Sequence, residues 1–596
     1  MTEPAPPTPP PARPGRRVLM SAGALAVVAV VTFGVLAPPE HCPTPDAAEL
    51  HAAADAAVQW FVRNQQDDGR WLYEYDAATG EASDDYNLVR HAGGIMGLYQ
   101  AASAGIEGAR ESADRGLAWA LDHLVEHDDW TALAFEGRAP VGGSALLAAG
   151  LAERRLHTGD TRYDDLLRRL GRFMASQTEP SGAVVAQYDA TRMRPVAGSR
   201  SRYYTGEAYW ALARLHLLFP DDGFGEVADR IGHYLATARD DAEDLWPPLP
   251  DHWVAYGLAE TATFPERDPE RPLTDAELAY AERQAGLFGA QVRWVSQQAG
   301  PWGPLVRGTK QPRGGGYGVV GEALTGLWRT ARADERLAGI RAPLAERATC
   351  IAGLAVEEQG RDGPSDPRAD GAWFIGDVTR MDDQQHAISA LLRTVAIVDA
   401  PAGDGDDAPS GWLWALALFG TWNALHVTLG VPRRDRRGER ETVALVGGLL
   451  GAAVVLVAAA VSGPLLDALD VSRPALRLAV GIVGAVAGLV RLLRRPLRPT
   501  SFAAARGWFG TALVPVTIPL VATPALIVLG LSAGADRGVA FVAGVLALGV
   551  AALTGVTAAI DPEGAARPVA VWGGRLLSAV AVVTSVLLVV HAVFDI

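Results

Sequence analysis

Apolar and polar positions follow a plan that repeats six times along the first two-thirds of the chain. Each repeat has a helix, a polar loop, and then a second, more apolar helix that opens on polar or glycine residues. Six such hairpins can close a ring, so the pattern predicts an all-α (α/α)6 toroid over residues 46–400. In a toroid the inner helices open at one mouth and gather distant residues around one cavity. The inner helices are expected to open near Tyr86, Val141, Tyr203, Asp251, Tyr317 and Asp382.

The first helix of each repeat is expected on the outside of the ring, because it is the more amphipathic of the two. The first outer helix ends in Gln65-x3-Gly69-x-Trp71, and related Gln-then-Gly endings recur at Gln177, Gln298 and Gln359. Their spacing is close to one or two hairpin lengths, which supports the repeat. The outer helices are predicted at 46–64, 110–126, 161–176, 224–239, 274–296 and 338–357.

The pattern changes abruptly near residue 405, after which the chain is apolar with clusters of arginine. A proline-rich tail over 1–17 is expected to be disordered and cytoplasmic, and an apolar run over 18–37 is expected to be a transmembrane signal-anchor. A linker is expected over 401–410, before a six-helix transmembrane domain at 411–596. Its apolar segments are predicted at 411–430, 442–466, 474–493, 508–533, 538–560 and 575–594.

Arginine clusters predict the orientation of these segments. Arg13, Arg16 and Arg17 precede the first segment, and two further clusters fall in alternate loops, at 433–440 and 494–506. Loops rich in arginine stay on the cytoplasmic side, so both signals give one topology. The protein is expected in the cell membrane with about seven spans, a cytoplasmic N-terminus and an extracytoplasmic region at 40–405.

Charge and composition exclude several classes of partner. The formal net charge of −15 lies mainly in the first region, so nucleic acid is not expected. No Cys/His spacing is typical of a zinc site, and neither a metal nor another cofactor is expected. The C-terminal segments hold few ionisable residues away from their ends, which favours anchoring in the lipid bilayer over ion transport.

The two cysteines, Cys42 and Cys350, lie in the region expected outside the cytoplasm, where disulfides can form. Cys42 precedes the first outer helix and Cys350 lies in the last, and these helices are neighbours in a closed ring. The sequence therefore predicts a disulfide that closes the ring, with two unpaired thiols as the alternative.

Several motifs resemble those of known α/α toroids. Gln65-x3-Gly69-x-Trp71 resembles the QW-type turn of terpenoid cyclases and other toroids. YNLVRHAG, YYTGEA, DHW and DDQQHAISALL resemble helix starts in bacterial six-hairpin glycan-processing proteins, which include glycoside hydrolases, sugar epimerases and some polysaccharide lyases. This resemblance covers residues 46–400 and implies action on carbohydrate, whereas the membrane region resembles no recognised family. The acidic DxDD motif of the cyclases is absent, so cyclisation is not expected.

Carboxylates at the helix starts are the candidates for acid–base chemistry. Asp85, Glu207 and Asp383 are the predicted catalytic residues. Glu207 follows two tyrosines and a glycine at the start of an apolar helix, where desolvation would raise its pKa as a general acid requires. For Asp85 and Asp383 the alternative is a helix N-cap, and for Glu207 it is a surface or capping-box glutamate.

Other polar and aromatic residues at the mouth are expected to contact substrate, because aromatic faces stack on sugars and arginine binds carboxylate or phosphate. Arg90 and His91 are adjacent, so one is expected to face the cavity and the other a neighbouring helix. The alternatives are an ion pair for Arg90, a core position for His386, and packing for the aromatic residues. The predicted substrate contacts are Tyr86, Asn87, Arg90, His91, Tyr204, Trp253, Tyr317 and His386; Asp84, Tyr203, Asp251, His252, Glu322, Asp382 and Gln384 are expected at the same mouth.

These observations favour a membrane-anchored extracytoplasmic protein that hydrolyses or modifies an envelope polysaccharide or glycoconjugate. A carbohydrate or glycoconjugate is the expected partner. One alternative is a non-catalytic receptor for a glycan or lipid-linked sugar, in which the mouth carboxylates affect affinity only. Another is an accessory subunit of an envelope assembly or transport system.

Overall fold

The computed structural model describes residues 14–309, 314–360, 366–400, 409–431, 438–494, 507–561 and 564–594. The chain divides into two units. One consists mainly of His41–Ser296 and Thr309–Asp407, and the other of Met1–Glu40, Gln297–Gly308 and Ala408–Val593. Most of the tail predicted over 1–17 and of the linker predicted over 401–410 lies outside the described residues.

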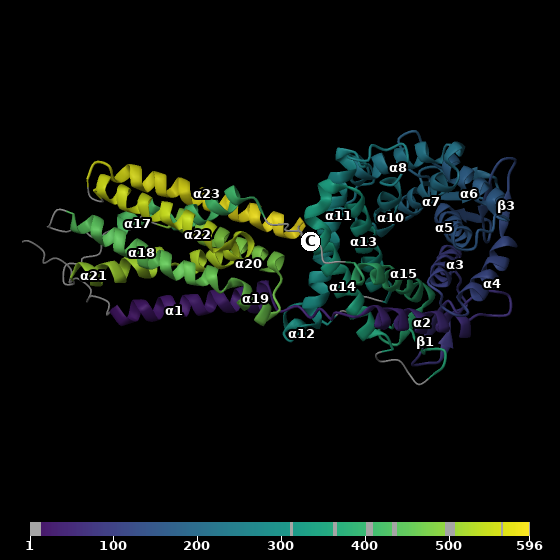
Figure 1. Cartoon of the computed structure of the whole chain (residues 1–596), viewed down its shortest axis with the longest axis horizontal. Coiled ribbons are helices and arrows are strands. Elements are labelled where there is room, and N and C mark those ends of the chain that lie inside the picture. The colour runs from purple at the N-terminus through teal and green to yellow at the C-terminus, as the bar shows by residue number, and fades with distance from the viewer. Residues whose placement is uncertain are drawn as a thin grey trace, which may run out of the picture. The chain divides into compact units, whose positions relative to one another are not determined.

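The first unit is a ring of two helical layers, which confirms the predicted (α/α)6 toroid (Figure 1). Each inner helix packs against the next, and the last packs against the first, so the ring closes. In the described residues the inner helices are α3 (Leu88–Ser103), α5 (Val141–Thr158), α7 (Tyr204–Leu218), α10 (His252–Thr261), α13 (Gly314–Ala333) and α15 (Met381–Val398). The outer helices are α2 (Ala47–Arg63), α4 (Ala109–Leu121), α6 (Asp164–Ser176), α8 (Phe224–Thr237), α11 (Asp275–Ala299) and α14 (Arg341–Glu358).

Short strands lead the chain from outer to inner helices. β5 (Arg138–Pro140) runs directly into α5, and β8 (Val378–Arg380) runs directly into α15. β8 pairs antiparallel with β1 (Glu74–Asp76), which joins the first hairpin to the last. The order in the small sheets is β2-β1-β8, β3-β4 and β5-β6-β7, where the other strands are β2 (Glu81–Ala82), β3 (Leu124–Glu126), β4 (Thr131–Leu133), β6 (Gln187–Asp189) and β7 (Arg194–Pro195).

The turn after α2 is held by the residues that predicted it. The Gln65 amide donates to the carbonyl oxygens of Gly69 and Ser112, both at 3.0 Å, and the Trp71 indole donates to Ser112 Oγ at 3.2 Å. Gly69 has a φ of 95°, and a Cβ there would lie 2.4 Å from the Arg115 carbonyl oxygen on α4. Only glycine fits both this backbone conformation and this close approach.

The same turn recurs after α14, where the sequence analysis recognised a Gln-then-Gly ending at Gln359 but not the glycine that completes the turn. Gln359 donates to the Gly371 carbonyl oxygen at 2.9 Å. Gly371 has a φ of 78°, and a Cβ there would lie 2.3 Å from the Ala56 carbonyl oxygen on α2. Gly371-x-Trp373 therefore repeats Gly69-x-Trp71, with a longer loop between the glutamine and the glycine.

A disulfide joins Cys42 to Cys350 across 308 residues of sequence, with the two Cα atoms 4.6 Å apart. It links the segment before α2 to α14, the pairing that the sequence analysis expects. Asp46 then starts α2 with a capping box, in which its side chain accepts from the Glu49 amide at 2.8 Å. The beginning and the end of the toroid are thus fastened to each other.

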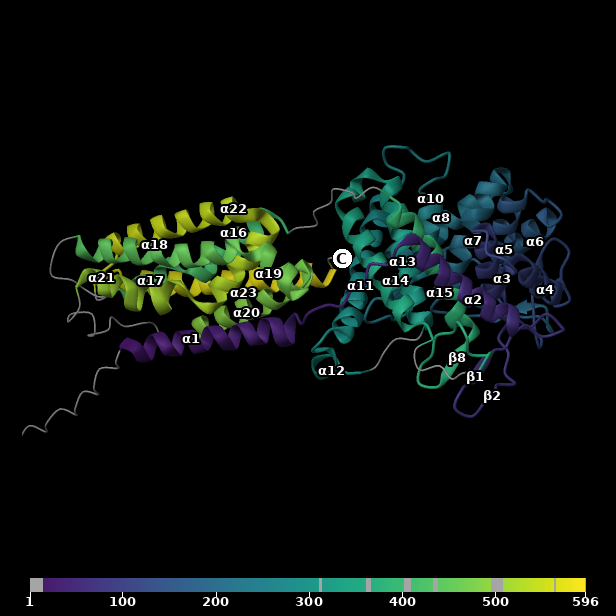
Figure 2. The same cartoon turned by 60° about the horizontal axis from the view of Figure 1, so that its bottom comes forward.

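The second unit consists of apolar helices. Among the described residues, five are long and apolar enough to cross a membrane: Leu19–Leu36, Glu439–Ala460, Arg473–Leu493, Pro524–Ala559 and Arg567–Val593. They belong to α1 (Pro14–Val30) with η1 (Val31–Leu36), α18 (Glu439–Ala460), α20 (Arg473–Leu493), α22 (Pro524–Ala559) and α23 (Arg567–Phe594). Figure 2 shows α18 and α22 running side by side.

Backbone breaks explain where these helices differ from the predicted segments. The segment predicted at 411–430 consists of α16 (Gly411–Trp422) and α17 (Ala424–Gly430), because Asn423 has a φ of 50°. The segment predicted at 508–533 begins with α21 (Trp508–Thr511) and η5 (Ala512–Val521). The break inside α22, at Gly538 with a φ of 81°, falls where the sequence analysis separates two segments. The number and direction of the crossings stay predictions.

One buried ion pair in this unit was not anticipated. Arg477 Nε on α20 lies 2.6 Å from Asp536 Oδ2 on α22, and the two side chains are 3% and 1% exposed. The α19 helix (Ser462–Leu469) precedes α20. This pair ties two apolar helices together through charges that lie away from solvent.

Candidate active site

A cavity of about 510 Å³ opens at the starts of the inner helices of the toroid. It is where the sequence analysis placed the mouth. The predicted catalytic and substrate-contact residues that line it are Asn87, Arg90, Tyr204, Glu207, Trp253, Asp383 and His386. It is also lined by Tyr203, His252 and Asp382, which the sequence analysis expects at the mouth, and by Gln291 and Gln385.

Four predicted site residues do not line this cavity. Asp85 is exposed, in the segment that leads to α3. Tyr317 is buried in α13, with 5% of its surface exposed. Tyr86 and His91 lie behind the cavity wall, in contact with the Trp71 turn.

Tyr86 and His91 form a hydrogen-bonded chain in the first hairpin. The His91 Nε2 atom lies 2.9 Å from the Gly116 carbonyl oxygen, so this nitrogen carries the proton. The Tyr86 hydroxyl then donates to His91 Nδ1 at 2.6 Å and accepts from the Trp71 amide at 3.2 Å. Burial lowers the pKa of His91 to about 3, so the ring is neutral. These contacts give both residues a role in holding the hairpin together.

Arg90, the neighbour of His91, does face the cavity. Its Nε lies 3.1 Å from Asp382 Oδ2, and its guanidinium also bonds the Tyr73 hydroxyl. Asn87 begins α3 as its N-cap, with Oδ1 accepting from the amides of Val89 and Arg90 at 2.9 and 3.1 Å. The first hairpin thus contributes a cation that is already paired with the sixth hairpin.

Glu207, in the first turn of α7, is 4% exposed and lines the cavity. Within the described part of the chain, its Oε2 atom has no hydrogen-bond partner. This atom reaches the start of α5, where a Cβ added at Gly142 would lie 1.9 Å from it. Burial raises the pKa of Glu207 well above its ordinary value, and the nearby Asp251 carboxylate raises it further. Both effects favour the protonated form of Glu207, as a general acid requires.

Asp251 and Asp383 are carboxylates with fixed partners. Asp251 caps α10, with Oδ1 accepting from the Trp253 amide at 3.2 Å and Oδ2 from the Arg239 guanidinium at 2.7 Å. Asp383 is 3% exposed, and its Oδ1 accepts from the Gly315 amide at 2.8 Å. Asp251 thus fixes the start of the helix that carries His252, and Asp383 connects the starts of α13 and α15.

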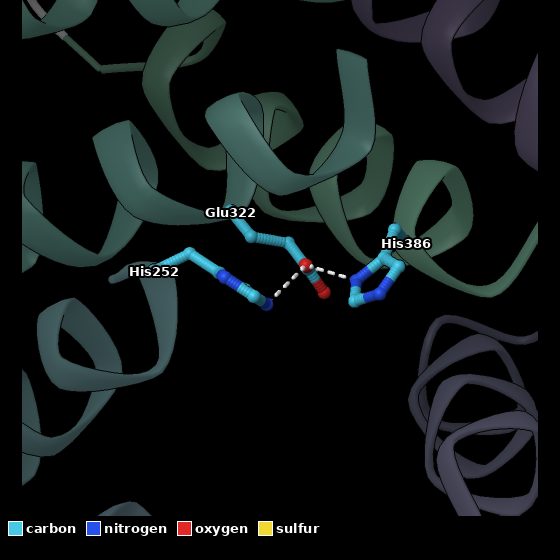
Figure 3. A group of neighbouring side chains, drawn as sticks. All are labelled: His252, Glu322 and His386. Carbon is cyan, nitrogen blue, oxygen red and sulfur yellow. Dashed lines mark hydrogen bonds and ion pairs between the residues drawn. The ribbon is translucent and has the colours of Figure 1, made fainter. Parts of the chain in front are cut away.

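Two histidines converge on one carboxylate in the cavity wall (Figure 3). His386 Nδ1 on α15 lies 2.6 Å from Glu322 Oε2 on α13, and His252 Nε2 on α10 lies 3.7 Å from the same oxygen. The two imidazole centres are 5.2 Å apart, with an angle of 77° between their planes. In the described structure neither nitrogen of His252 has a hydrogen-bond partner.

Burial and charge shift the pKa values of the two histidines in opposite directions. Burial lowers the pKa of His252 well below its ordinary value, and the neighbouring His386 lowers it further. Burial is the largest influence on His386 and acts to lower its pKa, but Glu322 together with Asp382 and Asp383 outweighs it, and the pKa of His386 is raised. These opposite shifts favour the neutral form of His252 and the charged form of His386 within one cavity.

The same three side chains offer nitrogen and oxygen atoms that all lie within 4.8 Å of one another, a separation compatible with a metal ion. However, two ligands of one ion stand about 3 Å or more apart, since metal–nitrogen and metal–oxygen bonds are about 2.0–2.2 Å long. The 2.6 Å separation between His386 and Glu322 is instead that of a charge-assisted hydrogen bond. The arrangement fits proton transfer better than metal coordination.

The sequence analysis placed His252 and Glu322 at the mouth but did not single them out. The signal that could have found them is their position. Each occupies the first turns of a predicted inner helix, as His386 does, so the three had to converge once the ring was closed. What the sequence did not contain was the rotation of each helix about its axis.

Solved structures with similar folds are α/α toroids. The cellobiose 2-epimerase from Spirochaeta thermophila DSM 6192 is 13% identical with a TM-score of 0.42, covering 64% of this chain and 98% of its own. The glycoside hydrolase family 76 (mannosidase) Bt3792 from Bacteroides thetaiotaomicron VPI-5482 is 12% identical with a TM-score of 0.41, covering 59% and 98%. No protein-family model and no curated protein matches this sequence. At these identities the likeness concerns architecture, and the chemistry must be inferred from this chain's own residues.

Proposed function

We propose that the toroid is a carbohydrate-processing enzyme that transfers protons at a sugar carbon, as an epimerase or isomerase does. The observation that carries this proposal is the pairing of His252, whose pKa is lowered, with His386, whose pKa is raised, with the two ring centres 5.2 Å apart in the cavity. Moving a proton next to a carbonyl group requires a base and an acid at the same time. The opposite pKa shifts suit His252 to act as the base and His386 as the acid.

The reaction follows from the two protonation states. His252 takes the proton from the carbon beside the carbonyl group of a ring-opened sugar, while His386 gives its proton to the carbonyl oxygen. The protonated His252 then returns a proton to that carbon of the enediol, on the opposite face after the enediol turns in the cavity, and His386 recovers its proton from the hydroxyl. Glu322 holds the charge on His386 between the two steps.

The rest of the cavity suits a sugar. Trp253 and Tyr204 contribute aromatic surface to the wall, and the pair formed by Arg90 and Asp382 offers hydrogen-bond donors and acceptors for hydroxyl groups. The volume of about 510 Å³ lies within the usual range of small-molecule sites, about 300–1,000 Å³. A sugar or the end of a glycan is the substrate class we infer.

We further propose that this toroid faces the outside of the cell. The disulfide between Cys42 and Cys350 supports this, because such bonds persist in oxidising compartments. The membrane-length helices support anchoring in the cell membrane. The substrate would then be an envelope or extracellular glycan.

Deuterium exchange tests the reaction. Full-length protein is incubated in D₂O with a panel of reducing sugars and glycan fragments, and products are read by mass spectrometry and NMR. Proton transfer should place deuterium on the carbon beside the carbonyl, and this exchange should disappear in His252→Asn and His386→Asn. Absence of exchange from every sugar would refute the proposal.

A second candidate, glycoside hydrolysis, is favoured by Glu207, which lines the cavity and whose pKa is raised by burial. Glu207 would protonate the glycosidic oxygen, and Asp383 would act as base or nucleophile. Hydrolysis would be recognised by a product that has gained the mass of water. This activity should be lost in Glu207→Gln and retained in His252→Asn, which is the reverse of the pattern expected for an epimerase. Binding without any product, in the wild type and in both variants, would instead favour a glycan receptor.

A further inference from the structure

A short segment between α11 and α13 belongs to the unit of apolar helices. Gln297–Gly308 groups with the N-terminal apolar helix and the C-terminal helices. It contains a single turn of helix, α12 (Gly303–Val306). Its sequence, QQAGPWGPLVRG, mixes prolines and glycines with a tryptophan and a leucine.

This segment is fastened to the end of the first apolar helix. The Arg307 guanidinium donates to the carbonyl oxygens of Val35 at 3.1 Å and Leu36 at 3.0 Å, the last residues of η1. A Cβ added at Gly300 would lie 2.3 Å from the Pro39 carbonyl oxygen, so the two backbones touch. The segment therefore lies where the candidate span Leu19–Leu36 ends.

Arg307 also fixes the shape of the segment. Its guanidinium donates to Gln297 Oε1 at 2.8 Å, its amide to the Gly303 carbonyl oxygen at 2.8 Å, and its own carbonyl oxygen accepts from Gln298 at 3.1 Å. These bonds connect the two ends of the segment, so the turn between them presents a defined surface.

That surface is apolar and exposed. Leu305 is 83% exposed and Trp302 is 56% exposed, next to Pro301 and Pro304, which are also exposed. An exposed leucine beside an exposed tryptophan at the end of an apolar helix has the composition of a membrane–water interface, where tryptophan is enriched.

We propose that Gln297–Gly308 is an interfacial anchor that inserts Trp302 and Leu305 into the lipid bilayer beside the end of the first span. Its occupant is lipid, because the helix end to which Arg307 fastens it is the point where an 18-residue apolar span leaves the bilayer. Such anchors enter about 5–10 Å into the boundary between headgroups and acyl chains. This inference does not depend on the reaction proposed for the cavity.

Spin labelling of the full chain tests the anchor. Leu305→Cys and, as a second site, Trp302→Cys are each labelled and reconstituted in phosphatidylcholine–phosphatidylglycerol vesicles. The native cysteines are paired in a disulfide and remain unlabelled. Thr79→Cys, in an exposed turn of the toroid, is the matched control for a water-exposed label.

The label at Leu305 should be more accessible to oxygen than to a water-soluble nickel chelate, and the label at Thr79 the reverse. Chelate access at Leu305 equal to that at Thr79 would overturn the proposal. A label that is immobile and shielded from both reagents would indicate a protein contact and would also overturn it.

Discussion

Replacing Glu322 with glutamine should lower the pKa of His386 by roughly one to two units. Glu322 is fully buried and the His386 side chain is 15% exposed, so solvent screens their 2.6 Å hydrogen bond only weakly. A hydrogen bond to a charged group contributes about 1.5–3 kcal/mol. Since one pKa unit corresponds to about 1.4 kcal/mol, the loss of the carboxylate predicts this shift.

The direction follows from what remains in the variant. Burial still disfavours the charged imidazolium, whereas glutamine supplies no negative charge to oppose it. Asp382 and Asp383 remain and limit the fall. In the wild type, the raised pKa of His386 stabilises the fold below the ordinary histidine pKa, and this stability is lost as the pH rises through the raised value. Glu322→Gln should remove that contribution.

The titration can be followed by NMR of full-length protein labelled with ¹⁵N-histidine, with His386 assigned by its absence in His386→Asn. Glu322→Asp keeps the charge at a shorter reach and should give a smaller shift. Glu260→Gln removes a carboxylate paired with Arg329 elsewhere in the ring and is the matched control. An unchanged His386 pKa in Glu322→Gln, or an equal fall in Glu260→Gln, would refute the reasoning.

Glu322→Gln should also shift only one of the two limbs in the pH profile of proton transfer. The acid limb is set by His252, whose lowered pKa keeps the base neutral well below pH 6.5. The basic limb is set by His386, whose raised pKa keeps the acid protonated above pH 6.5. Glu322→Gln should move the basic limb to lower pH and leave the acid limb in place. Movement of both limbs together would contradict these assignments.

Three further predictions concern packing. Gly142→Ala should cost about 1–3 kcal/mol by overpacking, because the new Cβ would lie 1.9 Å from Glu207 Oε2 and 2.6 Å from the Tyr204 ring. Glu207→Ala in the same chain should restore only the part due to Glu207, and a cycle in which the two changes simply add would contradict that contact. Gly371→Ala should destabilise the toroid by about 1–3 kcal/mol in urea unfolding, because alanine disfavours its positive φ, and unchanged stability would contradict the QW-type role. Loss of the disulfide in Cys42→Ser/Cys350→Ser should cost about 2–5 kcal/mol, which an unchanged melting temperature would refute.

The sequence predicted the toroid well because its signal is local and repeated. Five of the six inner helices open within two residues of the predicted point, and α13 opens slightly earlier, at Gly314. The short strands were missed because they pair across large separations, as Tyr75 does with Thr379. A strand of three residues carries too little periodicity to detect alone. The second QW-type turn was hidden by the longer loop before Gly371.

The candidate site was predicted in part, and the helix geometry explains the rest. Glu207, Asp383 and His386 line the cavity because each occupies the first turns of an inner helix. Asp85 precedes its helix by three residues and stays in solvent. Adjacent Arg90 and His91 separate as expected, with Arg90 facing the cavity and His91 the outer layer. Which of two neighbours faces inward depends on the rotation of the helix, and sequence periodicity fixes that only where one face is plainly apolar.

Close packing of the ring and the chemistry of its mouth have a common origin. In three places, a glycine at the start of one inner helix lies against a carboxylate at the start of the next inner helix. A Cβ at these glycines would stand 1.9, 2.7 and 2.8 Å from a carboxylate oxygen, for the pairs Gly142–Glu207, Gly206–Asp251 and Gly315–Asp383. The missing side chain admits the carboxylate to a site that excludes water, and this burial raises the pKa of Glu207 and Asp251. Glycines at helix starts, which would weaken isolated helices, here provide the space in which these acids are buried and their pKa values are raised.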